Sequence, residues 1–163
     1  MSTQVLILQQ RQRRRRELDP TAPQEVRDPF WTPFLEGTSL LATFDEPRAI
    51  ELLSQADSCC PEDPEVRAAL DETLGEAEFL LCDYTLALQH LRRAQRSWAD
   101  LKQPLFEAEV SGWVGACLVQ QGCYRDGFEA LSAALDALEK LGRKPRAARA
   151  LHYLAVIHEE LDE

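Results

Sequence analysis

The chain has 163 residues, 45% of them hydrophobic and 28% charged, with a formal net charge of -10. This is enough material for one globular domain that buries its core without disulfides or metals. No apolar run approaches the length that spans a bilayer, which excludes a transmembrane protein, and we expect no membrane partner. The apolar block Val5–Leu8 precedes the basic run, the wrong order for a secretory signal, so a cytoplasmic location is expected.

Residues 1–29 differ in charge from the rest of the chain. They hold six arginines and four acidic residues, a balance of +2, whereas residues 30–163 have a balance of -12. Pro20 and Pro23 break any helix, so we predict a flexible Arg-rich N-terminal tail. Arg11–Arg16 leave two alternatives open: an anion-binding arm that contacts nucleic acid, or a contact with a membrane surface. The acidic remainder is poorly suited to nucleic acid and better suited to a cationic or neutral partner.

From residue 30 onward, apolar residues recur every three or four positions, which predicts α-helices and no strands. Prolines at 61, 64 and 104 and glycines at 122 and 142 punctuate the pattern. The predicted helices cover residues 31–43, 47–59, 64–81, 84–101, 105–121, 124–141 and 145–161. The last helix carries apolar residues on a face that needs cover, so it is either a terminal cap or the joint to a further copy or segment: Leu151, Leu154, Val156 and Ile157.

A constant offset relates these helices to one another without a gap. Leu74–Ala77 falls on Val114–Cys117, and the same offset continues to Leu154 and Ala155. A fixed period of this length indicates stacked helical hairpins, which usually function by presenting a surface. The predicted domain, 30–163, divides into units at about 30–63, 64–103 and 104–143, followed by a terminal helix at 145–162. The first unit is degenerate, and its step to the second is slightly shorter than the step from the second to the third.

These residues resemble the tetratricopeptide (TPR) repeat, a helix-turn-helix unit with small residues where its helices meet. The resemblance implies an all-α, right-handed α-solenoid, in which bulky Leu91 and Leu131 fill the gaps between small residues and tyrosines anchor the turns. The corresponding positions are Gly75, Tyr84, Ala87, Ala94, Gly115, Tyr124, Gly127 and Ala134. Two features depart from the family pattern. The step from Gly75 to Gly115 is longer than the family's step of about 34 residues, and Glu78 and Leu118 replace the usual tyrosine of the first helix. In its longer step the chain is similar to the repeats of bacterial signalling and transcription regulators.

The family binds partners in a concave groove lined by the first helix of each unit. Carried over to this chain, the groove positions are Glu72, Glu76, Glu109, Gly112, Ala116, Gln120, Arg149, His152 and Glu159. The resemblance thus implies a non-catalytic protein-interaction module whose acidic groove takes a basic or amphipathic peptide. The competing interpretation is that these are ordinary solvent-facing polar residues. A further alternative is a regulatory or self-association domain of a larger regulator, with the last helix as the joint.

No catalytic, metal or cofactor motif is visible, so we expect neither an enzyme nor a cofactor. His152 and His158 are six residues apart and do not share a helix face as metal ligands would. The five cysteines include no C-x-x-C pair, which argues against a disulfide framework or a zinc site. We expect Cys82 and Cys117 to be buried, and the three tryptophans to serve packing.

Overall fold

A computed structural model describes residues 29–143 and 147–161. Within these ranges the chain is all-helical, with no strand. The seven helices are α2 (Trp31–Leu41), α3 (Glu46–Ser58), α4 (Pro64–Leu80), α5 (Tyr84–Asp100), α6 (Pro104–Gln120), α7 (Tyr124–Lys140) and α8 (Ala148–Leu161). Each lies within a few residues of a range predicted from the sequence. No helix in the described ranges is long and apolar enough to cross a membrane.

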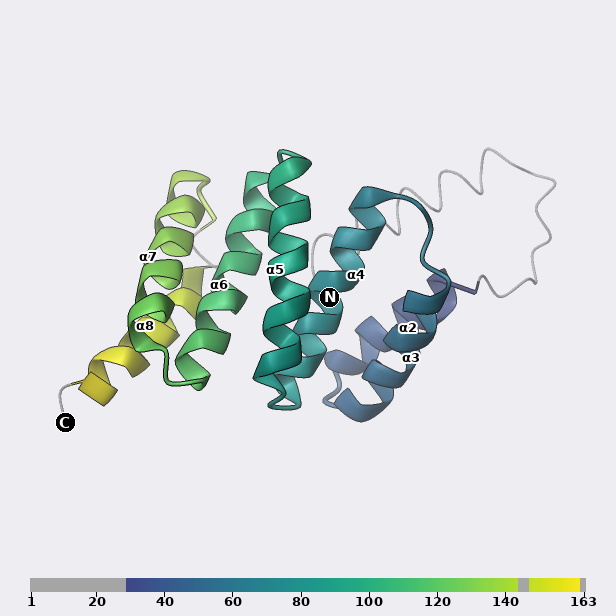
Figure 1. The fold of residues 1–163 in the computed structure, drawn as a ribbon, viewed down its shortest axis with the longest axis horizontal. Coiled ribbons are helices and arrows are strands. Elements are labelled where there is room, and N and C mark those ends of the chain that lie inside the picture. Colours follow the sequence, from purple (N-terminus) through teal and green to yellow (C-terminus); the bar gives the residue numbers. More distant parts are fainter. Residues whose placement is uncertain (1–28, 144–146, 162–163) are drawn as a thin grey trace.

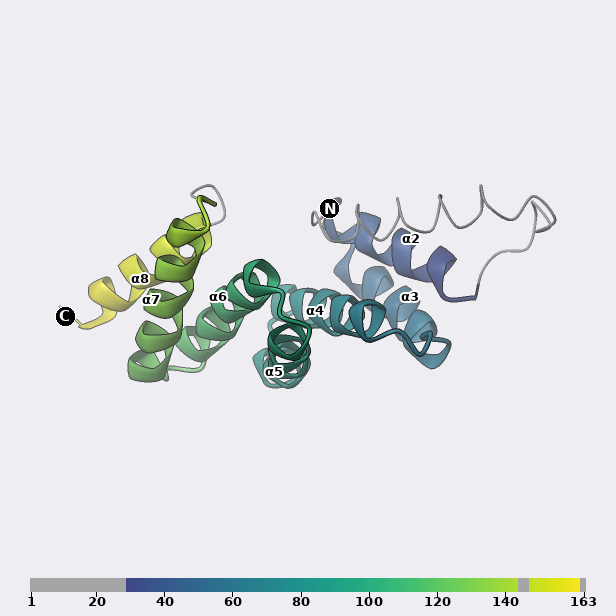
Figure 2. The same ribbon diagram turned by 90° about the horizontal axis from the view of Figure 1, so that it is seen from above.

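The helices form a row of antiparallel hairpins. The pairs α2–α3, α4–α5 and α6–α7 pack internally, and α8 packs on both α7 and α6. Figure 1 shows the hairpins side by side along the long axis of the molecule, as in an α-solenoid. Figure 2 shows the row bending into an arc, with α5 on its outer side. Contacts of α4 with α2 and α6, and of α6 with α8, join the first helices of successive units into an inner layer.

Short connections give each helix a defined start and end. Asp63 caps α4 by accepting from the backbone N–H of Glu65 at 3.0 Å, and Asp83 caps α5 by accepting from Leu86 at 3.1 Å. After α6 and α7 the chain turns through left-handed Gly122 (φ 75°) and Gly142 (φ 67°), the conformation that favours glycine at a helix C-terminus.

Cys82 occupies the same left-handed turn position after α4, with φ 62°. It is exposed there, so the prediction that Cys82 is a buried apolar residue was wrong. The physical reason is the turn: Cys82 corresponds to Gly122 in the next unit and forms part of the connection, not of a packed helix face. Cys117, in the middle of α6, is fully buried as expected.

Small residues hold the two helices of each hairpin together. A Cβ on Gly75 would lie 2.5 Å from Leu91 Cγ, and one on Gly115 would lie 2.6 Å from Leu131 Cγ. Real carbon atoms do not approach so closely, so only glycine admits these leucines, which are both fully buried. A Cβ on Gly127 of α7 would lie 2.9 Å from Val119 Cγ2.

The remaining predicted packing positions follow the same pattern. Ala87, Ala94 and Ala134 are buried between helices. Tyr84 packs against Phe79, with ring centroids 5.3 Å apart, and the Tyr124 hydroxyl donates to Glu160 Oε2 at 3.4 Å. At the equivalent position in α8, Ala155 is exposed, because no described helix packs on that face.

Candidate functional site

A cavity of about 540 Å³ lies along the inner layer of helices. Its described lining comes from α4, α6 and α8, with α2 and its C-cap at one end and the last turns of α7 contributing one leucine. The lining residues are Thr38, Leu41, Ala42, Glu72, Thr73, Glu76, Glu109, Gly112, Trp113, Leu138, Ala148, Arg149 and Ala150. Three carboxylates and one guanidinium therefore meet in a cavity whose remaining walls are mostly apolar.

Arg149 and Trp113 form one wall of this pocket. The guanidinium carbon of Arg149 lies 3.3 Å from the centroid of the Trp113 ring, a cation–π contact. Burial lowers the pKa of Arg149, while the charges of Glu76, Glu72 and Glu109 act in the opposite direction. The indole face therefore already supports one half-buried arginine in an acidic setting.

The surroundings of Glu76 shift the ionisation of this pocket carboxylate. Burial raises its pKa, and the positive charge of Arg149 opposes that rise. Removing water from a carboxylate makes its charge costly, and an additional cation near it relieves that cost. The pocket can thus stabilise a bound positive charge.

Hydrogen bonds hold three other polar lining groups. Trp98 Nε1 donates to Glu72 Oε2 at 3.2 Å, so α5 orients this buried carboxylate from behind. The hydroxyls of Thr38 and Thr73 donate to the carbonyl oxygens of Phe34 and Ala69, four residues back in their own helices. The described lining contains no serine, cysteine, histidine or lysine. The described lining therefore presents charged groups and contains no serine or cysteine nucleophile.

The structure gathers five of the predicted groove residues in this pocket: Glu72, Glu76, Glu109, Gly112 and Arg149. Gln120, His152 and Glu159 are exposed and do not line it.

Ala116 is fully buried, so its prediction as a groove residue was wrong. Three rings meet in the same region of the core: Phe79 lies 5.1 Å from Trp113 and 6.1 Å from Tyr153, centroid to centroid. These rings and Ala116 belong to the apolar core that joins α4, α6 and α8.

Sequence reasoning missed two parts of the pocket. It assigned Trp113 to packing, although the indole also supports Arg149. It also overlooked the contribution of α2 through Thr38, Leu41 and Ala42, because the first unit is degenerate and its register is hard to transfer. The repeat register did contain a signal for Trp113, which directly follows the predicted groove position Gly112.

A second polar cluster lies between α4 and α5, outside the pocket lining. Asp71 is buried and lies 2.8 Å from His90 Nδ1 and 3.0 Å from a guanidinium nitrogen of Arg93. His90 Nε2 lies 3.4 Å from Glu78 Oε1. Among the described residues no group of three or more histidine, cysteine or acidic side chains is arranged to hold a metal ion. We therefore regard this cluster as a structural tie within one hairpin.

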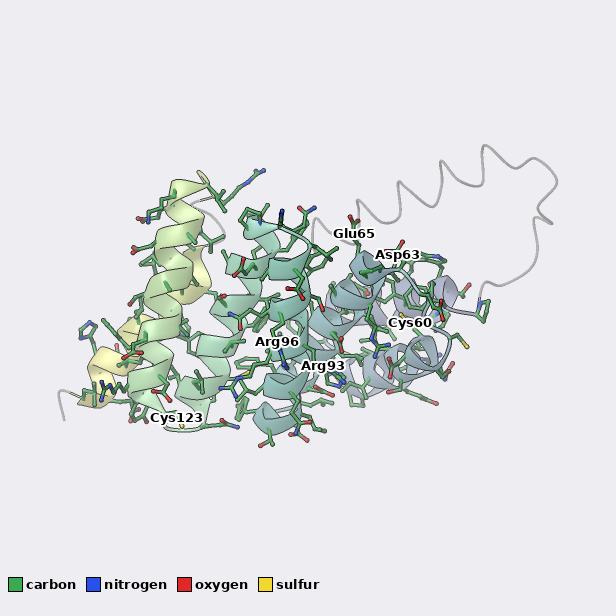
Figure 3. All side chains as sticks on the ribbon, turned by 45° about the horizontal axis from the view of Figure 1, so that its top comes forward. Cys60, Asp63, Glu65, Arg93, Arg96 and Cys123 are labelled. Carbon is green, nitrogen blue, oxygen red and sulfur yellow. The ribbon has the colours of Figure 1, made fainter. Side chains whose placement is uncertain are left out.

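All five cysteines are free thiols. Cys60 lies before α4 and Cys123 in the turn before α7, and Figure 3 shows them far apart across the molecule. Burial raises the pKa of the Cys117 thiol to about 12, which disfavours its reactive thiolate.

The fold is similar to those of two solved structures. The chain is similar to the Rap conjugation gene regulator of the plasmid pLS20, solved in complex with the Phr* peptide, with a TM-score of 0.73 and 16% identity. The match covers 98% of this chain and 49% of the regulator, so the chain spans about half of that protein's length. It is also similar to MamA, with a TM-score of 0.55 and 17% identity over 92% of this chain and 86% of MamA. No family model and no curated protein sequence matches. The fold is a TPR-like helical solenoid.

Proposed function

We propose that the chain is a non-catalytic protein-interaction module whose concave pocket binds a basic or amphipathic peptide of a partner protein. The observation that carries this proposal is the pocket itself: Glu72, Glu76 and Glu109 surround one arginine on an indole face. Apolar walls beside an acidic centre suit a helix or extended peptide with arginine or lysine next to leucine-like residues.

The solved complex of the Rap regulator with the Phr* peptide supports a peptide ligand by analogy of fold. The chemistry of this chain's ligand is argued from its own pocket. A peptide cation entering it meets partly desolvated carboxylates, where attraction is stronger than at an open surface.

A titration with a labelled synthetic peptide of leucine and arginine tests the proposal, with a leucine–glutamate peptide as the reference. We expect the arginine peptide to bind the full chain and the glutamate peptide not to bind. Glu76→Lys should weaken binding at least about tenfold, equivalent to about 1.4 kcal/mol. Glu76 is preferred to Glu72 for this test, because Glu72 is buried and accepts a hydrogen bond from Trp98.

Glu129→Lys is the matched control. It makes the same charge change on α7, where the Glu129 side chain is 68% exposed and outside the pocket. If both variants weaken binding equally, only the net charge matters and the pocket is not the binding site.

A second candidate function is self-association or regulation within a larger assembly, through the end of the row formed by α7 and α8. Leu151 and Leu161 are 52% and 66% exposed, and Phe128 on α7 is 43% exposed. Analytical ultracentrifugation would show a concentration-dependent dimer that Leu151→Glu disrupts. A monomer at all concentrations would contradict this candidate.

A further inference from the structure

The strongest unexplained match in this protein is between the acidic pocket and the chain's own N-terminal sequence. Five of the six residues from Arg11 to Arg16 are arginine, and the apolar block Val5–Leu8 lies just before them. The pocket offers the complementary pair of features: Glu72, Glu76 and Glu109 at its centre, and an apolar wall. That wall is formed by Leu41, Ala42, Leu138, Ala148 and Ala150.

We propose that the segment Val5–Arg16 occupies the concave pocket of the same chain and competes there with outside peptides. The inference rests on the proposed function and names a ligand that is part of the same chain. Residues 1–28 lie outside the described residues.

The chain length allows this contact. The 14 residues from Arg16 to Phe30 can span up to about 45 Å when extended. From the start of α2 to Leu41 at the pocket, the 11-residue helix covers only about 17 Å. Pro20, Pro23 and Pro29 favour an extended connection rather than a helix.

Arginine suits this pocket better than lysine. Its planar guanidinium stacks on aromatic faces and pairs with carboxylates through two hydrogen bonds. Arg149 on Trp113 already displays the stacking contact inside the pocket. Because the segment is tethered, its effective concentration at the pocket is on the order of millimolar, enough to exclude a weakly bound outside peptide.

The test uses the full chain with its arm arginines neutralised. The arm variant carries Arg→Gln changes at Arg11, Arg13, Arg14, Arg15 and Arg16. The matched control variant makes the same total charge change at five exposed arginines elsewhere: Arg48, Arg92, Arg96, Arg125 and Arg143.

The first readout is affinity for a labelled peptide that copies residues 3–18 of this chain. We expect the arm variant to bind this peptide at least about tenfold more tightly than the wild-type chain does. The control variant should bind it like the wild type. Adding Glu76→Lys to the arm variant should remove the gain.

The second readout does not depend on any added peptide. The chain has three tryptophans, so the indole N–H signal of Trp113 can be assigned in a nitrogen–proton spectrum with Trp113→Phe. We expect this signal to differ between the wild type and the arm variant at low salt, and to be the same in the wild type and the control. The difference should shrink at high salt, because exposed ion pairs are screened.

The outcomes separate the two proposals. In one outcome the wild type and the arm variant bind the peptide with equal affinity, and Glu76→Lys lowers the affinity of both. That result overturns the contact between the N-terminal segment and the pocket of its own chain, and it leaves the proposed function intact. No peptide binding to any variant, with an unchanged Trp113 signal, overturns both.

Two further results overturn the inference in favour of another partner. A Trp113 difference that grows with protein concentration assigns the pocket to the segment of a second copy. Salt-sensitive binding of a DNA duplex that the arm variant loses, without any change at Trp113, assigns the arginines to nucleic acid.

Discussion

The hairpins α4–α5 and α6–α7 share one packing geometry and differ in what they enclose. In each, a glycine on the first helix faces a leucine on the second: Gly75 with Leu91, and Gly115 with Leu131. All four helices have 17 residues, and both hairpins close through a left-handed residue.

Their polar contents are unlike each other. The α4–α5 hairpin holds Asp71, Glu78, His90 and Arg93 in one connected cluster. The equivalent positions of the α6–α7 hairpin are Ser111, Leu118, Ala130 and Ala133. The two hairpins thus keep the same glycine–leucine contacts while they differ at these four polar positions. Glu72 of the first hairpin and Gly112 of the second, which both line the pocket, are another such pair.

The largest expected effect comes from removing the shared leucines. Leu91→Ala and Leu131→Ala should each cost about 2–5 kcal/mol of unfolding free energy, because each leaves a cavity at a fully buried site. Urea titrations followed by circular dichroism measure this. Leu86→Ala, at a half-exposed position of α5, is the control and should cost far less. Strongly unequal losses at Leu91 and Leu131 would break the equivalence of the two hairpins.

Alanine usually stabilises a helix relative to glycine, but at Gly75 we expect the opposite. Gly75→Ala should destabilise the protein by about 1–3 kcal/mol, since Leu91 and the Ala87 carbonyl leave no space for a methyl group. Thermal melting measures the change.

Gly112→Ala provides the control within the same fold. A Cβ at Gly112 would meet no atom within 4 Å, so alanine should stabilise α6 by about 0.5–1 kcal/mol. If both alanine variants shift the melting temperature in the same direction, the close approach at Gly75 does not limit packing.

The polar cluster of α4–α5 can be replaced by the equivalent residues of α6–α7. His90→Ala alone should cost about 1–3 kcal/mol, because it leaves buried carboxylate oxygens of Asp71 and Glu78 with fewer partners. Glu78 Oε2 already lacks a hydrogen-bond partner among the described residues. Installing the complete set of the other hairpin should recover most of that loss, since apolar replacement of a buried ion cluster is often neutral. The set is Asp71→Ser, Glu78→Leu, His90→Ala and Arg93→Ala, and its failure to recover stability would mean that the polar cluster is required for packing.

The contacts shared by the two hairpins were predictable from the sequence, whereas the features that differ between them were harder to predict. The glycine and alanine positions recur with the repeat because the backbone spacing of nested helices requires them, so Gly75, Gly115 and the helix boundaries were predictable. The pocket was only partly predictable from the sequence. Its α2 wall lies in the degenerate first unit. Ala116 shares a register with Glu76 but lies fully buried in the apolar core, and its burial depends on how side chains of different helices pack in space. Cys82 was mispredicted because an apolar context does not reveal a left-handed turn.

The smallest expected effect is a pH dependence that reports on the pocket. Burial raises the pKa of Glu76 in the folded chain, so between its ordinary and its raised pKa the folded state binds more protons than the unfolded state. Stability from this group is therefore lost as pH rises through that interval, and the penalty is complete above it. Glu76→Gln lacks the titration, so its stability relative to the wild type should increase with pH and then level off.

A variant of Arg149 tests whether its charge and that of Glu76 interact. The positive charge of Arg149 opposes the rise in the pKa of Glu76, so Arg149→Gln should enlarge the loss of stability with pH that Glu76 causes, and adding Glu76→Gln should remove that contribution. Denaturant titrations at a series of pH values provide the data. A decline that Arg149→Gln leaves unchanged would show that the two groups do not interact. If the predicted coupling is found, one arginine on Trp113 only partly offsets the cost of the buried charge. A second cation that enters the pocket can offset part of that remainder, less the cost of its own desolvation.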